Sequence, residues 1–123
     1  MPIFGVGIDL VKVRRIQTGI EKFPKKFRSR IFTKNEIAFC ETMVFKYLSY
    51  AARFAAKEAF SKALGTGLRG QISWQDIEVI DDERSKPNLL ITGKAKKFLG
   101  DRKILVSLSH TEDYATAIVI IED

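Results

Sequence analysis

The segment that most restricts the fold is Lys46–Leu64. It contains neither glycine nor proline and places alanine at positions 51, 52, 55, 56, 59 and 63. Alanine is the best helix former, and its small side chain lets neighbouring elements approach closely. The segment therefore predicts one long helix, most of it buried. Gly65-Thr66-Gly67 predicts the end of the helix, with Gly65 or Gly67 in the left-handed conformation that caps helices.

Two elements are expected at the start of the chain. Ile3–Asp9 alternates apolar residues with Gly5 and Gly7 and predicts a strand, and the glycines indicate that another backbone passes close by. A helix should follow from about Val11 and end before Pro24, because a proline interrupts helical hydrogen bonding. Its buried stripe, at spacings of three and four, would consist of Val13, Ile16, Ile20 and Phe23.

A capping box and a series of short apolar runs define the remaining elements. Thr33-x-x-Glu36 predicts that a helix runs from Lys34 to about Thr42. In the second half we expect one short helix, Gly93–Leu99, and four strands: Ile77–Ile80, Asn88–Thr92, Ile104–Ser109 and Tyr114–Ile121. The last two strands should pair as a hairpin through a turn at His110–Asp113. The order predicts an α+β fold, with helices on one side of an antiparallel sheet.

Length and composition narrow the class of protein. A chain of 123 residues predicts a single domain, 1–123, and its 46% hydrophobic and 29% charged residues exclude a disordered or collagen-like chain. The longest apolar run, Ala117–Ile121, is too short to insert into a membrane, and charges in the first twenty residues exclude a signal peptide. Cys40 is the only cysteine and cannot form an internal disulfide. We therefore expect a soluble, cytoplasmic protein.

Positive charge is concentrated near the start of the chain. Residues 1–70 carry a net charge of +9 and residues 71–123 a net charge of −3. The segment Lys12–Lys34 holds nine basic residues and a single acidic one, Glu21. Such a segment attracts polyanions: nucleic acid, anionic lipid, phosphorylated small molecules or an acidic protein. Composition does not choose among these partners.

Three polar residues are candidates for chemistry. Asp9 ends the predicted first strand, where it could either cap the following helix or take a metal or catalytic role. Glu58 and Lys62 are four residues apart and share one helix face, which suits a surface ion pair. Their helix should be largely buried, however, and buried charges need partners or a metal. Carboxylates distant in sequence, with basic residues around them, are compatible with a magnesium–phosphate site.

Other polar residues give weaker signals. His110, the only histidine, lies in a predicted turn, where a structural role is the more frequent one. Gly65-Thr66-Gly67 lacks the pattern of a phosphate-binding loop, and Cys40 has no base near it in sequence. No histidines and cysteines have zinc-ligand spacing. Trp74 could belong to the core or to a subunit contact.

Five motifs together resemble bacterial holo-[acyl-carrier-protein] synthases, which are 4′-phosphopantetheinyl transferases. The motifs span most of the chain and are Gly5–Leu10, Arg53–Gly67, Ser73–Glu78, Lys86-Pro87 and Ser107–Thr111. The resemblance implies the 4′-phosphopantetheinyl transferase fold, with an antiparallel sheet packed against the long alanine-rich helix, in a homotrimer with active sites between subunits. The implied reaction moves phosphopantetheine from coenzyme A to a serine of apo-acyl carrier protein. It releases adenosine 3′,5′-bisphosphate and supports fatty acid biosynthesis.

The resemblance also implies roles for individual residues. Asp9 and Glu58 match the ligands of the catalytic Mg²⁺, and Lys62 matches the lysine that faces the coenzyme A phosphates. Arg53, Gly65 and His110 fall where the family holds the nucleotide. Four residues fall where the family binds its acidic carrier protein: Arg15, Lys26, Phe27 and Arg30. Glu58 is also the candidate base for the serine proton.

Two other functions remain compatible with the same residues. A small nucleic-acid-binding module would use the basic segment Lys12–Lys34, although two of its three phenylalanines have the spacing of core residues. A magnesium-dependent phosphohydrolase would use the same carboxylates, and it would consume coenzyme A without an acceptor protein.

Overall fold

The computed structural model describes residues 2–68, 71–81 and 84–123. The long helix α4 (Lys46–Leu64) has the bounds predicted from sequence, and it ends at Gly65, whose φ of 90° is left-handed. Its alanines at positions 51, 55, 56 and 59 are fully buried. This face packs against a three-stranded antiparallel sheet made of β1 (Ile3–Lys12), β5 (Tyr114–Glu122) and β4 (Lys103–His110), in that order.

The first strand lies directly against α4, as its glycines predict. A Cβ atom on Gly5 would overlap the carbonyl oxygen of Ala63, and one on Gly7 would overlap the carbonyl oxygen of Ala59. A larger residue at either position would push the strand away from the helix, because backbone cannot yield as a side chain can. The two glycines therefore set the distance between β1 and α4.

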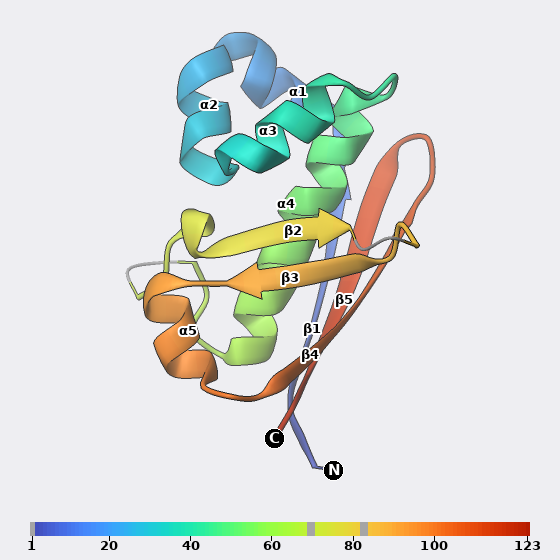
Figure 1. Ribbon diagram of the computed structural model, residues 1–123. Coiled ribbons are helices and arrows are strands. Elements are labelled where there is room, and N and C mark those ends of the chain that lie inside the picture. Colours follow the sequence, from blue (N-terminus) through green and yellow to red (C-terminus); the bar gives the residue numbers. More distant parts are fainter. Residues whose placement is uncertain (1, 69–70, 82–83) are drawn as a thin grey trace.

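The remaining strands form a separate sheet, which the sequence did not predict. β2 (Ile77–Asp81) and β3 (Pro87–Ile91) pair only with each other in the described residues, and they cross in front of α4 in Figure 1. The single antiparallel sheet expected from the strand pattern is thus divided in two. The hairpin of β4 and β5 is confirmed, and α5 (Gly93–Leu99) has its predicted bounds.

Three helices gather at one end of α4 (Figure 1): α1 (Val13–Lys22), α2 (Pro24–Ile31) and α3 (Lys34–Glu41). The capping box of α3 is present as predicted. Helix α1 ends before Pro24, as predicted, but the sequence analysis did not predict α2, which begins at Pro24 because proline is tolerated in the first helical turn. Phe23 was expected in the buried stripe of α1 but is 58% exposed, whereas Ile16 and Ile20 are buried.

The core lies between α4 and the three-stranded sheet and extends to the helices at its end. Its largest fully buried side chains include Tyr50, Phe32 and Phe60. At the opposite end of the molecule the two chain termini meet, where the Asp123 amide donates to the Pro2 carbonyl at 2.9 Å. Of the helices in the described ranges, none combines the length and the apolar character needed to cross a bilayer.

Candidate active site

The clearest polar contact between β1 and α4 joins Asp9 to Lys62. The Lys62 Nζ atom lies 3.1 Å from Asp9 Oδ1 and donates to the Ile8 carbonyl at 3.0 Å. The Asp9 side chain is 15% exposed and that of Lys62 is 50% exposed. The Asp9 carboxylate is therefore mostly buried, whereas the Lys62 side chain that pairs with it is half-exposed to solvent.

The backbone position of Asp9 differs from the sequence prediction. Strand β1 continues to Lys12, so Asp9 lies inside the strand, opposite Ala117 of β5. It does not cap α1, which begins at Val13 with no side-chain cap. The strand is three residues longer than predicted, because Leu10, Val11 and Lys12 also pair with β5 in the same register. Asp9 is consequently held by strand hydrogen bonds on a rigid element.

Glu58 lies one helical turn before Lys62, on the same side of α4. It is half-buried and lines a groove of about 510 Å³. The groove residues come from α1, α2, the residue between these two helices, α4 and the 3-10 turn η1 (Trp74–Asp76). They are Arg15, Phe23, Lys26, Phe27, Arg30, Ile31, Phe54, Glu58 and Trp74. The structure thus places the candidate base, Glu58, in one groove with all four candidate partner-binding residues, Arg15, Lys26, Phe27 and Arg30.

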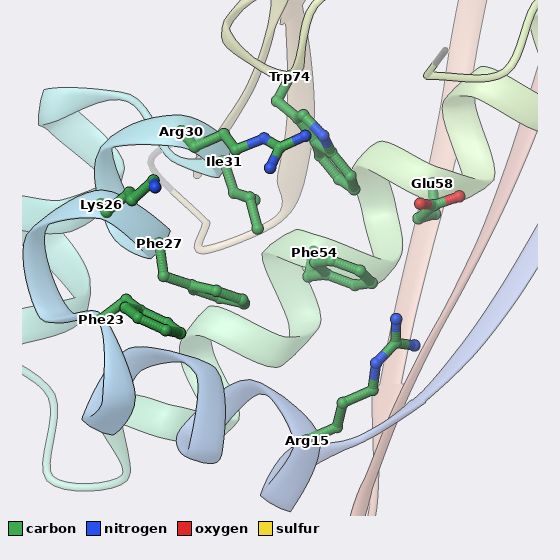
Figure 2. A pocket seen from close by; sticks show the side chains of 9 residues that line it. All are labelled: Arg15, Phe23, Lys26, Phe27, Arg30, Ile31, Phe54, Glu58 and Trp74. Atoms are coloured by element: carbon green, nitrogen blue, oxygen red, sulfur yellow. The ribbon is translucent and has the colours of Figure 1, made fainter.

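Figure 2 shows how this groove is built. Phe54 and Trp74 stack with ring centroids 5.0 Å apart, and the guanidinium carbon of Arg15 lies 5.8 Å from the centre of the Phe54 ring. Lys26 and Arg30 are exposed on α2. The groove therefore combines an aromatic lining with positive charge, which suits an acidic partner or a phosphorylated ligand that also has an apolar part.

Positive charge continues over the surface of α1 and α2, as the sequence predicts. Seven basic side chains of the segment Lys12–Lys34 lie on exposed residues of β1, α1 and α2: Lys12, Arg14, Arg15, Lys22, Lys25, Lys26 and Arg30. Arg28 differs, because its guanidinium group pairs with Glu41 at 3.0 Å. Three of the seven, Arg15, Lys26 and Arg30, line the groove, whereas Lys12 and Arg14 line another hollow together with Glu21, Glu112 and Asp113.

Arg53 and His110 lie away from the Asp9–Lys62 pair within one chain. At about 100° per residue, Arg53 is about 140° around the axis of α4 from Glu58 and about 180° from Lys62. Its guanidinium group is buried, 3.6 Å from an Asp81 oxygen, and within the described residues its Nε atom has no hydrogen-bond acceptor. His110 was expected in a turn but is the last residue of β4, the opposite edge of the sheet from β1.

His110 lines a second groove, of about 560 Å³, with residues that begin α4. These include Phe45, Lys46, Tyr47 and Leu48. Gly65 follows the last turn of α4, close in sequence to Lys62. Of the six residues that resemblance assigns to metal, phosphate or nucleotide, Asp9 pairs with Lys62, one turn from Glu58 and close in sequence to Gly65. The other two lie apart from this group and from each other: Arg53 contacts Asp81, and His110 lines the second groove.

Asp9 and Glu58 could hold a magnesium ion only if waters and substrate phosphates supply its other ligands. No three carboxylate, histidine or cysteine groups gather into a metal site in the described ranges. Asp9 and Glu58 are the two carboxylates available to such an ion, and Asp9 is paired with Lys62 in this structure. Mg²⁺ is often bound by one or two protein carboxylates, with waters and substrate phosphates completing its shell. The donor set fits magnesium on this condition.

Sequence reasoning missed a second pair of charges. Lys57 Nζ lies 2.6 Å from Glu36 Oε1, and both side chains are fully buried. Burial lowers the pKa of Lys57, and the neighbouring Glu36 carboxylate opposes that change. The charged residues in the largely apolar α4 indicated that each needs a partner of opposite charge. The sequence around Lys57 contains no pattern that identifies Glu36, the capping residue of α3, as that partner.

Cys40 is excluded as a nucleophile. The thiol is fully buried, and burial raises its pKa to about 12. The reactive thiolate is therefore absent at neutral pH.

Comparison with known proteins was made on sequence and on structure. Residues 5–119 match the family model of the 4′-phosphopantetheinyl transferase superfamily. The holo-[acyl-carrier-protein] synthase of Koribacter versatilis is 46% identical, over 98% of this chain and 99% of that protein. The crystal structure of the Neisseria meningitidis holo-[acyl-carrier-protein] synthase superposes with a TM-score of 0.91 at 36% identity, covering 99% of this chain and 100% of that one. The Bacillus anthracis synthase, crystallised in complex with CoA (3′,5′-ADP), gives a TM-score of 0.82 at 38% identity, covering 98% and 96%.

Proposed function

The chain belongs to the 4′-phosphopantetheinyl transferase superfamily, and we propose from this that it modifies an apo-acyl carrier protein. A serine hydroxyl of the carrier attacks the phosphorus of coenzyme A that bears the pantetheine arm. A new phosphorus–oxygen bond forms to serine, the pyrophosphate bond breaks, and adenosine 3′,5′-bisphosphate leaves. The observation that carries the proposal is Glu58 in an apolar groove with a basic surface, one helical turn from the Asp9–Lys62 pair.

Asp9, Glu58 and Lys62 form the reacting centre in this proposal. Asp9 and Glu58 would hold Mg²⁺, which would neutralise charge on the coenzyme A phosphates. Lys62 is half-exposed at its tip and can turn from Asp9 to the same phosphates, where its ammonium stabilises negative charge. Glu58 lines the groove that the carrier serine enters, and accepts the serine proton directly or through one water.

The groove and the basic surface bind the carrier protein. Arg15, Lys26 and Arg30 attract an acidic partner, while Phe27 contributes apolar contact beside them. Because exposed charges act mainly on association, this surface increases the rate of encounter more than it tightens the final complex.

A homotrimer explains two features that a single chain leaves open. The face of the three-stranded sheet turned away from α4 is apolar and exposed, with Val6 55%, Ile8 62%, Leu10 65% and Leu105 51% exposed. A second copy of the chain would cover this face. A closed ring of copies would also let the exposed His110 of one subunit reach the nucleotide held by Asp9, Lys62 and Gly65 of the next, whereas Arg53 would first have to leave its buried contact with Asp81.

We further propose that residues 1–123 act as a single domain, in the cytoplasm. The alternating helices and sheets share one continuous core, and the buried, unpaired Cys40 is compatible with a reducing compartment.

The test is the intact mass of an apo-acyl carrier protein after incubation with coenzyme A, Mg²⁺ and this protein. A gain equal to one phosphopantetheine, with release of adenosine 3′,5′-bisphosphate, is expected. Cleavage of coenzyme A without an acceptor would instead indicate a phosphohydrolase. A basic nucleic-acid-binding module would leave both substrates unchanged and shift a nucleic-acid probe in a gel.

A further inference from the structure

Lys57 makes the most buried polar cluster of the molecule, and the proposed reaction does not use it. Its ammonium group is fully buried and contacts three acceptors: Glu36 Oε1 at 2.6 Å, the Ile31 carbonyl at 2.8 Å and the Trp74 carbonyl at 3.1 Å. A lysine ammonium has three N–H donors, so each can be matched to one acceptor. Lys57 is therefore fully satisfied without solvent.

The three acceptors belong to three different segments. Ile31 is the last residue of α2, Trp74 is the first of the turn η1, and Glu36 lies in α3. Glu36 extends the cluster, because its second oxygen accepts from the Val79 amide of β2 at 2.8 Å. One side chain on α4 thus connects α2, α3, η1 and β2 to the central helix.

Two of these segments are walls of the groove that contains Glu58. Ile31 and Trp74 both line it, and α2 also carries Lys26, Phe27 and Arg30. Lys57 directly precedes Glu58 on α4. Lys57 therefore joins both walls to α4 one residue from Glu58, while Gln75 Nε2 joins η1 to the Ser29 and Phe32 carbonyls at 2.8 and 2.7 Å.

Stability alone is a weak reason for such a cluster. A buried ion pair is often no more stabilising than apolar residues of similar volume, since desolvation offsets the attraction. A lysine that holds two backbone carbonyls of separate segments does something an apolar residue cannot do: it fixes where those segments lie.

We propose that Lys57 is a positioning residue, which holds the α2 and Trp74 walls of the groove at the spacing that carrier-protein binding and transfer require. It acts through those walls and does not touch either substrate. The expected effect on transfer kinetics rests on the proposed transferase function. The expected effect on the position of the groove walls does not.

The experiment compares Glu36→Gln with the double variant Glu36→Gln/Lys57→Met. Both lack the buried ion pair, but only the first keeps the ammonium that holds the Ile31 and Trp74 carbonyls. The double variant also avoids leaving a buried carboxylate unpaired, which the single Lys57→Met variant would do. Ile121→Ala, which removes core contacts in β5 near the chain termini and away from α1, α2 and η1, serves as a control for general loss of stability.

Two readouts are measured on folded protein. The first is acrylamide quenching of Trp74, the only tryptophan, which reports the groove wall directly. The second is transfer kinetics with each substrate varied in turn. In the double variant we expect stronger quenching and a fall of roughly 10- to 100-fold in kcat/KM for the carrier protein, since small displacements of positioning groups cost up to about 100-fold. KM for coenzyme A should change less than about twofold in that variant, because the nucleotide and phosphate contacts lie outside the displaced walls.

Glu36→Gln loses the counter-ion of Lys57 and one amide hydrogen bond, from Thr33 or from Val79, so it should lose stability. Its Lys57 still donates to the Ile31 and Trp74 carbonyls, so both readouts should stay closer to those of the unaltered protein than the readouts of the double variant do. Ile121→Ala should keep both readouts near those of the unaltered protein. Equal quenching and equal kinetics in Glu36→Gln and the double variant would show that Lys57 is only a stabilising residue, and would overturn the proposal. Absence of transfer by the unaltered protein would instead refute the proposed function, while the quenching comparison would still decide whether Lys57 holds the groove wall.

Discussion

Replacement of Asp9 by alanine separates a role in catalysis from a role in folding. Asp9 is held inside β1 by strand pairing, which the substitution leaves intact. The side chain itself makes one ion pair, to a Lys62 group that is 50% exposed. Exposed ion pairs contribute about 0.2–1 kcal/mol, a small part of a total stability of about 5–15 kcal/mol. We therefore expect the free energy of unfolding to fall by less than about 1 kcal/mol.

The effect on activity should be much larger. If Asp9 holds the metal, its loss removes several kcal/mol of charge stabilisation in the transition state, and each 1.4 kcal/mol corresponds to about tenfold in rate. A loss of roughly 100-fold or more in holo-carrier formation is expected, with a higher magnesium concentration needed for the remaining activity.

The assay pairs urea unfolding with intact-mass measurement of the carrier protein at several magnesium concentrations. Asp123→Ala is the matched control, because its carboxylate also forms one partly exposed ion pair, to Arg102 at 3.0 Å, near the chain termini. The control should lose similar stability and keep full activity. Near-normal transfer by Asp9→Ala at low magnesium would refute the metal assignment, and a loss of stability above about 3 kcal/mol would make Asp9 a structural residue.

Four further predictions test separate parts of the structure. Arg15→Glu should raise KM for the carrier protein and leave KM for coenzyme A nearly unchanged, and the activity of the variant should decrease less with added salt. Equal salt dependence of the variant and the unaltered protein would place Arg15 in the nucleotide site or the fold. Ile8→Asp puts a charge on the apolar sheet face and should give monomers in sedimentation equilibrium; a monomeric unaltered protein at micromolar concentrations would count against the trimer. Gly7→Ala should cost about 1–3 kcal/mol or more in thermal unfolding, because the new methyl overlaps the Ala59 carbonyl, and an unchanged melting temperature would contradict the close packing of β1 on α4. Cys40, whose pKa is raised to about 12 by burial, should resist alkylation at pH 8 until urea unfolds the chain, and rapid labelling of folded protein would disprove its burial.

The candidate site was predicted more completely than its surroundings. Asp9, Glu58 and Lys62 were identified by resemblance, and the structure places Asp9 against Lys62 although they are 53 residues apart. The four residues predicted to bind the partner line one groove with Glu58, an arrangement that the sequence analysis did not predict. Phe54 and Trp74, which line the same groove, were not selected from sequence, because an aromatic residue near a core has the same pattern whether it faces the core or a groove.

Errors at the first helices have a similar cause. Helix α2 was not predicted, because Pro24 was interpreted only as the end of α1, whereas proline is also compatible with the first turn of a following helix. Phe23 has the spacing of a buried residue on α1, but the chain turns at that point and leaves it 58% exposed on the groove. A periodic pattern assumes that the helix continues, and it fails where the direction of the chain changes.

The sequence by itself determined the features that depend on neighbours within a few residues. The bounds of α4, its left-handed Gly65 cap and the capping box of α3 follow from local hydrogen bonds and backbone sterics, which act over one or two helical turns. Only the tertiary structure decided the division of the strands into two sheets and the burial of Lys57 against Glu36. These depend on which segments, distant along the chain, exclude water from each other, and no local pattern records that choice.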